Sequence, residues 1–350
     1  MTQLKDVFAG KISGGSRLHF GLFSTRMDNE PGGNRVYGGL GMMVDSPSWE
    51  IYGESSTKWS IEGEGQERFG YLLDSLSKAF AGSTPVAFQI RTTLPAHLGL
   101  GSGTQMALAF AQLALCLNKT PENHVIDSSE LVGKLCRMTG RGLRSAIGSH
   151  GFVRGGFLVD GGQKRKTNEN NPGNDLEIGQ LLARLDFPPE WPIVICRRTD
   201  RAGLSGNKEK KVFETLNRLN QANLESIRRD RLCRLALLGV LPSLLDSDWR
   251  RFGESLGDFN RLAGEPFALW QGGDHLEGTE GWLGFCRENR IYGVGQSSWG
   301  PSLFAICQDL DQAKFLVRNW FSKGFGPREG IQICKSCNQG AAFHQLKSRS

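Results

Sequence analysis

Apolar and polar positions follow helical periods in some segments of the chain and strand periods in others. Residues 104–117 are apolar or small at nearly every position, which predicts a helix buried on all sides. Residues 86–91, which precede this helix, are predicted to form a strand. The rest of the first third of the chain contains short strand-like runs and glycine-rich turns. An amphipathic helix is predicted by apolar residues at helical spacing: Phe69, Leu72, Leu73, Leu76 and Phe80.

The remaining segments continue this mixture of helices and strands. A polar stretch over residues 161–179 reads as a loop or linker. The predicted helices are residues 129–139, two between 207 and 245, and 313–321, and the predicted strands are 155–159, 191–196, 291–294, 302–307 and 331–334. We therefore predict an α+β architecture in two layers, with helices covering mainly antiparallel sheets. The expected domains are residues 1–180 and 181–350.

Composition narrows the class of protein. The chain has 350 residues, of which 39% are hydrophobic and 22% charged, typical of a folded soluble protein. Its net charge is +6, but the basic runs at 208–211 and 228–231 include acidic residues and lack interleaved aromatics, so no nucleic-acid partner is expected. The apolar stretches 106–117 and 235–245 are shorter than the roughly 20 residues that span a bilayer. Without a signal-like start, a cytoplasmic protein with no membrane partner is expected.

The eight cysteines lie mostly in apolar segments, as reduced thiols in a cytoplasmic protein do. Only Cys334 and Cys337 form a CxxC pair, and no second pair completes a zinc site. No residue of the chain is therefore predicted as a metal ligand.

The most informative segment is residues 94–105, which opens the buried helix. Glycines there allow the backbone to turn tightly and approach a ligand, and the helix N-terminus presents unpaired N–H groups to phosphate oxygens. The alternative is that the turn only caps the helix. The predicted phosphate-binding residues are Gly99, Gly101, Ser102, Gly103, Thr104 and Gln105.

This segment resembles the second motif of the GHMP kinases, Pro-x-x-x-Gly-Leu-Gly-Ser-Ser, but departs from it at residues 103–105. Two further motifs agree in order and spacing, at residues 16–21 and 293–301, although His19 stands where a kinase tends to have Asn. With the run at residues 140–151, the whole set resembles the ribofuranosylaminobenzene 5'-phosphate synthase family of the GHMP kinase superfamily.

The resemblance implies a GHMP-kinase-like two-domain fold, with a ribosomal S5 domain 2-like N-terminal domain and a ferredoxin-like C-terminal domain. It implies that phosphoribosyl pyrophosphate and 4-aminobenzoate, or 4-hydroxybenzoate, give a C-riboside 5'-phosphate with loss of pyrophosphate and carbon dioxide, a step of tetrahydromethanopterin biosynthesis. Because pyrophosphate is a highly charged leaving group, we expect Mg²⁺ as cofactor. The oligomeric state stays open, with a homodimer as one option.

Such a reaction needs cations on three anionic groups and a group that orients the aromatic ring or moves a proton. The catalytic candidates are His19, His150 and Arg144, and the candidates for substrate binding are Arg17, Arg154, Arg197, Gln296, Ser297, Ser298 and Trp299. Residues 192–204 begin on a strand and end in a loop that is expected to close over the ligand. The alternative interpretation makes the histidines structural, places Arg141 and Arg144 on a surface helix face, and makes residues 297–299 a plain hairpin.

Two other functions compete with the synthase. An ATP-dependent small-molecule kinase of the same superfamily would use the same phosphate-binding segment. A noncatalytic ligand-binding or RNA-associated protein could have kept the fold, and it would bind RNA in a salt-dependent manner without turnover.

Overall fold

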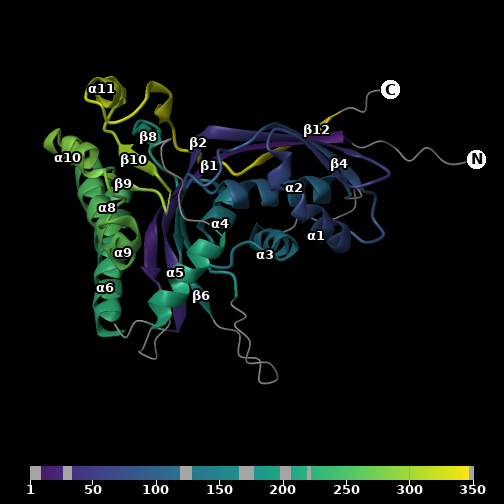
Figure 1. The fold of residues 1–350 in the computed structure, drawn as a ribbon, viewed down its shortest axis with the longest axis horizontal. Helices are drawn as coiled ribbons and strands as arrows, with labels where there is room; N and C mark the ends of the chain where they lie inside the picture. Colours follow the sequence, from purple (N-terminus) through teal and green to yellow (C-terminus); the bar gives the residue numbers. More distant parts are fainter. Residues whose placement is uncertain are drawn as a thin grey trace, which may run out of the picture.

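The computed structural model describes residues 9–26, 34–118, 128–164, 177–197, 206–218, 222–298 and 300–346. Two β-sheets with their helices form two domains that lie side by side (Figure 1). The α+β class predicted from the sequence is confirmed.

The first sheet is built around two long strands, β1 (Ala9–Ser24) and β2 (Arg35–Ser55), which pair antiparallel. The sequence predicts only short runs here, because the pairing shifts register between Gly14 and Ser16 and again between His19 and Gly21. Each shift changes which side chains face the core, so the alternation expected for one long strand is lost. The other strands are β3 (Ser60–Gly63), β4 (Val86–Thr92), β5 (Phe157–Asp160), β6 (Gln163–Lys164), β7 (Leu181–Leu185) and β12 (Ala342–Leu346).

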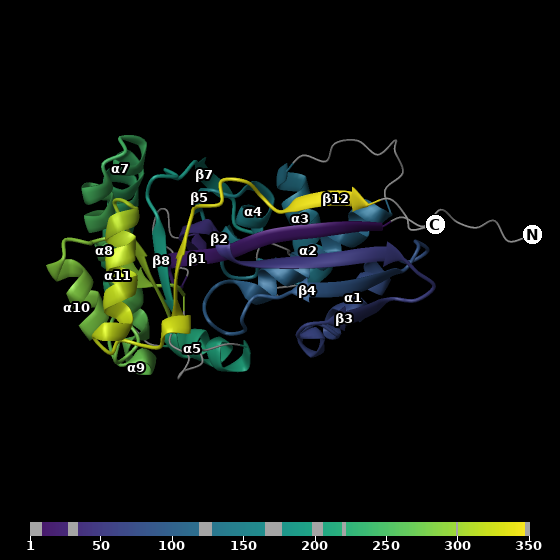
Figure 2. The ribbon, with the colours of Figure 1, turned by 90° about the horizontal axis from the view of Figure 1, so that it is seen from above.

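Strands from beyond residue 180 complete this sheet. β12 pairs with β1, and β7 pairs with β5 (Figure 2). The chain therefore returns to the first sheet twice after residue 180, and the domain boundary predicted there stays a prediction.

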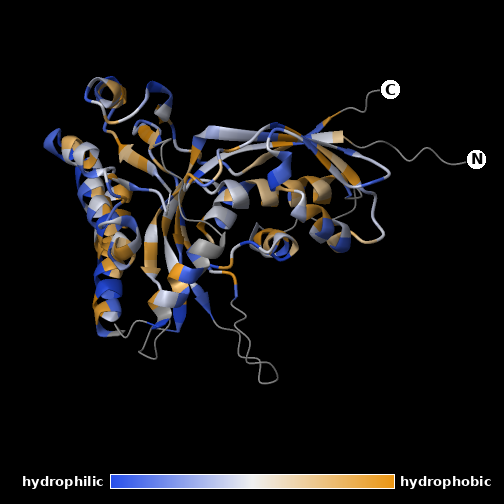
Figure 3. Cartoon of the chain, viewed as in Figure 1, coloured by the Kyte–Doolittle hydropathy of each residue, from blue (hydrophilic) through white to orange (hydrophobic). Residues whose placement is uncertain are grey.

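Four helices cover one face of the first sheet (Figure 1). They are α1 (Tyr71–Ala79), α2 (Ser102–Leu117), α3 (Ser128–Thr139) and α4 (Ile147–Arg154). The prediction of a helix buried on all sides is confirmed by α2, in which twelve of sixteen residues are buried. Figure 3 shows the hydrophobic colour of α2 beneath the sheet. Such a helix is stable only between layers, so its first turn is fixed by the domain core.

The core of the first domain depends on Phe110 in α2. Its fully buried ring lies 5.1 Å from the ring of Phe88 and 5.6 Å from the ring of Phe69, measured between centroids. We expect Phe110→Ala to lower the free energy of unfolding by about 3–5 kcal/mol, because it removes apolar contacts and leaves a cavity. Urea unfolding followed by circular dichroism measures this. A loss below about 1 kcal/mol, the range of a surface substitution, would contradict the packing.

The second sheet has the strand order β11-β8-β10-β9, and all its described pairs are antiparallel. Its strands are β8 (Ile193–Arg197), β9 (Val294–Gln296), β10 (Ser302–Ile306) and β11 (Ile331–Cys334). The helices of this part are α5 (Gly206–Arg218), α6 (Ala222–Leu235), α7 (Leu241–Leu245), α8 (Trp249–Gly264), α9 (Ala268–Gln271), α10 (Glu280–Glu288) and α11 (Leu310–Ser322). A single π-helical turn, Ala236–Val240, joins α6 to α7.

Helix α8 was not predicted from the sequence, yet it packs against β1 and β9 and so contacts both sheets. Its apolar residues Phe252, Leu256 and Phe259 are fully buried. The helix carries the buried Asn260 to the place where the two sheets meet. In the described part of the chain, no helix is long and apolar enough to cross a membrane.

Candidate active site

Three of the sequence motifs meet where the two sheets adjoin, although they are far apart in the chain. The Arg17 N–H donates to the Leu100 carbonyl at 3.0 Å, and the Ser298 N–H donates to the His19 carbonyl at 3.0 Å. The Ser297 hydroxyl accepts from the His19 N–H at 3.0 Å and donates to the Gly99 carbonyl at 2.8 Å. Residues 16–21, 94–105 and 293–301 therefore form one connected unit.

Two glycines allow this close approach. A Cβ on Gly99 would lie 2.1 Å from the Ser297 carbonyl oxygen, and a Cβ on Gly300 would lie 2.2 Å from the backbone of Leu98. Gly99 also has a φ of +77°, which side-chain-bearing residues rarely adopt. Gly99 is therefore needed for the close packing of two loops, in addition to the phosphate binding predicted for it.

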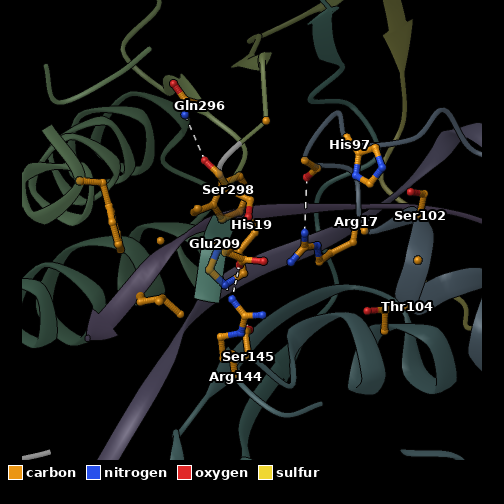
Figure 4. Close-up of a pocket in the computed structure, with 18 of the residues that line it drawn as sticks. Arg17, His19, His97, Ser102, Thr104, Arg144, Ser145, Glu209, Gln296 and Ser298 are labelled. Carbon is orange, nitrogen blue, oxygen red and sulfur yellow. Dashed lines mark hydrogen bonds and ion pairs between the residues drawn. The ribbon is translucent and has the colours of Figure 1, made fainter. Parts of the chain in front are cut away.

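A cavity of about 730 Å³ opens beside this unit. It is lined by the β1 segment, the first turn of α2, the loop 140–145 before α4, and residues of α5 and α8 (Figure 4). Of the predicted site residues, the cavity wall contains Arg17, His19, Gly99, Gly101, Ser102, Gly103, Thr104, Arg144, Gln296 and Ser298. A cavity of this size can hold a small phosphorylated substrate and an aromatic acid.

The first turn of α2 faces this cavity. The N–H groups of Thr104 and Gln105 both donate to the Gly101 carbonyl, whereas those of Ser102 and Gly103 have no acceptor within the described part of the chain. Gly101 has a φ of +75° and makes no side-chain cap. Free N–H groups at the positive end of a sixteen-residue helix attract an anion.

Arginines surround this turn. The Arg17 Nε atom lies 3.1 Å from where a Cβ of Gly101 would be, and the Arg141 guanidinium lies 3.6 Å from where a Cβ of Gly103 would be. Arg68 also lines the cavity and donates to the Ser102 hydroxyl at 3.3 Å. The Nε atoms of Arg17 and Arg141 are buried without a hydrogen-bond acceptor in the described residues. These groups favour an anionic ligand over the helix end.

Among the described residues, two carboxylates line the cavity: Asp274, and Glu209 of α5, which forms an ion pair with Arg144 at 2.7 Å. Burial lowers the pKa of Arg17 to about 10, although Glu209 raises it. Arg17 stays protonated at neutral pH, so the cavity carries excess positive charge at the end of α2.

His19 lies on β1 at the centre of the cavity wall (Figure 4). Its side chain is buried, and Nε2 lies 3.1 Å from the Ser145 hydroxyl. Burial, and then the charge of Arg17, hold the pKa of His19 well below its ordinary value. The imidazole is therefore neutral at neutral pH, so it can accept a hydrogen bond or a proton at one nitrogen.

Gln296 and Ser298 line the cavity but also hold its wall together. The Gln296 amide donates to the Ser298 carbonyl at 3.1 Å, and its oxygen accepts from the Leu276 N–H at 2.6 Å. Asn260 of α8 accepts from the Gln296 N–H at 2.9 Å. Ser297 is fully buried in the motif unit described above.

Four other predicted site residues lie away from the cavity. The Gln105 amide donates to the Gly148 carbonyl, and His150 Nε2 lies 2.8 Å from the Gly179 carbonyl behind the site. Arg154 contacts the Ser129 hydroxyl, and Arg197 contacts the Glu329 carbonyl. Their placement favours structural roles, because each side chain makes a hydrogen bond within the fold.

Part of the predicted site lies outside the described residues. Trp299 and residues 198–205 of the expected closing loop belong to that part. Their roles stay predictions.

The cavity also contains residues that the sequence analysis missed: Arg68, Tyr71, Ser145, Glu209 and His275. Burial lowers the pKa of His275 to about 4, and this ring contacts Asn260 at 3.0 Å. Ser145 could have been found, since it lies inside the recognised run 140–151. Arg68 and Glu209 stand in helical segments with no motif, so nothing local marks them.

Known proteins resemble the chain in sequence and in fold. Residues 240–326 match the family described as GHMP kinases C terminal. The chain is 28% identical over 336 residues to a β-ribofuranosylphenol 5'-phosphate synthase of Archaeoglobus fulgidus, covering 93% of this chain and 96% of the relative. A synthase of the same name from Methanothermobacter thermautotrophicus is 28% identical over 311 residues, covering 84% and 87%.

The chain is similar to these synthases over most of its length. The resemblance inferred from the four motifs is thereby confirmed, and the protein is an enzyme.

This chain also resembles enzymes of known structure, which confirms the two-domain GHMP-kinase-like fold predicted from the sequence. Mevalonate kinase of L. major superposes with a TM-score of 0.67 at 14% identity, covering 96% of this chain and 98% of the kinase. Mevalonate diphosphate decarboxylase of Staphylococcus aureus superposes with a TM-score of 0.64 at 12% identity, covering 97% and 98%. At this identity the likeness shows a common fold alone.

Proposed function

We propose that this synthase joins the ribosyl group of phosphoribosyl pyrophosphate to a 4-substituted benzoate and releases pyrophosphate and carbon dioxide. The product is a C-riboside 5'-phosphate, as tetrahydromethanopterin biosynthesis requires. The relatives are named as synthases of a ribofuranosylphenol phosphate. This name favours 4-hydroxybenzoate over 4-aminobenzoate as the substrate.

The observation that carries this proposal is the ring of arginines around the free end of α2. Arg17, Arg68 and Arg141 line the cavity together with the first turn of the helix. Phosphoribosyl pyrophosphate carries phosphate groups at both ends, and such a ligand suits a cavity with several guanidinium groups and few carboxylates.

The reaction needs positioning and charge stabilisation more than a strong nucleophile. The ring carbon that bears the carboxylate attacks the anomeric carbon, and the C–O bond to pyrophosphate breaks with its electron pair on the leaving oxygen. Arg17 and the N–H groups of Ser102 and Gly103 stabilise the charge that develops there. Breaking the bond to the carboxylate then restores the aromatic ring and releases carbon dioxide.

His19 supplies the other requirement of this chemistry. The substrate hydroxyl loses its proton as the ring attacks and regains it when carbon dioxide leaves. A neutral imidazole beside the ring can take up that proton and return it. Arg144, which lines the same wall and pairs with Glu209, is placed to bind the carboxylate of the aromatic acid.

The donor set of the cavity fits Mg²⁺ held mainly by the diphosphate. Among the described residues, no group of three or more His, Cys, Asp or Glu could hold a metal ion by itself. Mg²⁺ commonly keeps several waters and binds through substrate phosphates with one or two protein oxygens. The Ser102 and Thr104 hydroxyls and the Glu209 carboxylate would supply these oxygens, and the ion would neutralise charge on the leaving pyrophosphate.

We expect excess chelator to reduce the activity to background, and added Mg²⁺ to restore it. The reason is that the arginines alone do not neutralise a leaving pyrophosphate. Initial rates measured against free Mg²⁺ concentration check this. Full activity in excess chelator would contradict the metal requirement.

Release of labelled carbon dioxide tests the proposed function directly. The protein is incubated with carboxyl-labelled 4-hydroxybenzoate or 4-aminobenzoate, with and without phosphoribosyl pyrophosphate. We expect release only when both substrates are present, with the 4-hydroxy acid turned over faster. In a parallel reaction, ATP replaces phosphoribosyl pyrophosphate and alcohols replace the acids. Product formed only in this second reaction would show a kinase and overturn the proposal.

A further inference from the structure

The cavity wall has an apolar part as well as the cationic part around α2. The cationic part consists of the arginines described above, next to the first turn of the helix. Toward α5 and α8 the wall contains the apolar residues Leu22, Phe213, Ala263 and Phe267. Phosphate groups gain nothing from an apolar wall, whereas a flat hydrocarbon ring is stabilised when it leaves water for such a surface. The two substrates of the proposed reaction therefore fit two different parts of one cavity.

The apolar part of the wall is held in place by one packed cluster. Leu22, Phe213 and Phe267 belong to it, and the two phenylalanine rings form a T-shaped pair with centroids 5.8 Å apart. Tyr37 of β2 forms a second T-shaped pair with Phe213 at 5.5 Å. The backbone of Tyr37 has a φ of +70°, which residues with a side chain rarely adopt. Such strain persists only where the surrounding structure holds it, so this wall is fixed before a ligand binds.

Leu22 reaches the cavity because β1 contains a β-bulge. His19 and Leu22 are three positions apart in β1, so a regular strand would direct them to opposite faces of the sheet. The pairing of β1 with β2 shifts register between His19 and Gly21, and both His19 and Leu22 line the cavity. The bulge thus places an apolar side chain in the same wall as the proposed base.

Arg144 connects the apolar part of the wall to a site for an anionic group. Its guanidinium carbon lies 5.3 Å from the centroid of the Phe213 ring. Glu209 pairs with the Nη1 atom of Arg144, and because a guanidinium has several N–H donors, a second carboxylate can bind the same side chain. A benzoate carries its carboxylate directly on the ring. It can therefore contact Arg144 and the apolar wall at the same time.

We propose that Leu22, Phe213 and Phe267 form the subsite for the ring of the aromatic acid, whose carboxylate binds Arg144. This assignment rests on the proposed function. It places the ring carbon that bears the carboxylate at the boundary between the apolar and cationic parts of the cavity. That carbon attacks the sugar, whose diphosphate binds at the end of α2, so the two reacting carbons meet at this boundary.

Steady-state kinetics of Leu22→Ala test this subsite. The substitution removes apolar contact with the ring and leaves every group that binds phosphate in place. We expect KM for 4-hydroxybenzoate to rise about 5- to 20-fold, whereas KM for phosphoribosyl pyrophosphate stays within about twofold. Leu22→Met should keep both KM values near those of the unchanged protein, because it conserves the apolar volume.

Leu216→Ala is the matched control for this experiment. Leu216 lies in α5 and belongs to the same hydrophobic cluster, but it does not line the cavity. Its truncation should lower the melting temperature, since it removes buried apolar contacts, and should leave KM for 4-hydroxybenzoate unchanged. The control therefore separates contact with the ring from the stability of the cluster.

Two results would overturn the inference. They are an unaltered KM for 4-hydroxybenzoate in a folded Leu22→Ala variant, and an equal rise of this KM in Leu22→Ala and Leu216→Ala. If Leu22→Ala fails to fold, Phe267→Leu decides in the same way, because it trims the wall from the turn after α8.

Failure of the proposed function would be visible separately. In that case no protein releases carbon dioxide from 4-hydroxybenzoate and phosphoribosyl pyrophosphate. Titration calorimetry with 4-hydroxybenzoate then decides the subsite. Binding that is weakened in Leu22→Ala and unchanged in Leu216→Ala would support it, and absent binding or equal binding by all three proteins would overturn it.

Discussion

Replacing Arg17 with Met should weaken the binding of phosphoribosyl pyrophosphate about 10- to 100-fold without lowering the melting temperature. Charge-assisted hydrogen bonds contribute about 1.5–3 kcal/mol each, and the free Nε of Arg17 beside Gly101 is placed to make one. Arg17 has lost much of its hydration, which is why its pKa falls to about 10. Removing the charge should therefore change the stability of the ligand-free protein little. Titration calorimetry and thermal melts give the two quantities.

Arg250→Met is the matched control for this experiment. It removes the same charge from α8, where the Arg250 side chain is 71% exposed and pairs with Glu254. It should leave the affinity within twofold or so, because exposed charges away from a site are screened. Equal affinities for the Arg17 variant and its control would show that the phosphates bind elsewhere.

Substitutions at Gly101 and Gly103 should separate backbone strain from loss of ligand binding. The sequence predicts the same result for both, namely that Val damages binding more than folding. The structure distinguishes them. At Gly101 the φ of +75° makes Val strained, and we expect a loss of stability of about 1–3 kcal/mol in addition to lost binding. Gly103 has helical backbone, and a Cβ there meets Arg141 only at 3.6 Å.

We therefore expect Gly103→Val to keep nearly the full melting temperature while its methyl groups cover the free N–H groups of the first turn. The affinity for phosphoribosyl pyrophosphate should fall at least tenfold, since the phosphates lose charge-assisted contacts. Gly284→Val is the matched control, because Gly284 lies in α10 with nothing within 4 Å of an added Cβ. Unchanged affinity in a folded Gly103→Val variant would mean that this turn only caps the helix.

Arg68 and Glu209 show where prediction from the sequence stopped. Arg68 is the last residue of a short 3-10 turn before α1, and Glu209 lies in the first turn of α5, so each has the pattern of an ordinary helical charge. Both face the cavity only because their elements, which are distant in the sequence, fold against it. His150 shows the reverse case, and its predicted role stays a prediction. It lies in a recognised motif, but its Nε2 atom is within hydrogen-bond distance of the Gly179 carbonyl behind the site.

The sequence alone determined the features that arise from local order along the chain. The apolar character of residues 104–117 required a buried helix, and the glycines before it required a turn that leaves N–H groups free. The tertiary structure alone decided which side chains share the cavity. The contact of His19 Nε2 with the Ser145 hydroxyl joins β1 to the loop before α4, and the hydrogen bond from the Ala146 N–H to Asp160 joins that loop to β5. Such contacts depend on strand register and on the approach of Gly99 to Gly300, which no local pattern specifies.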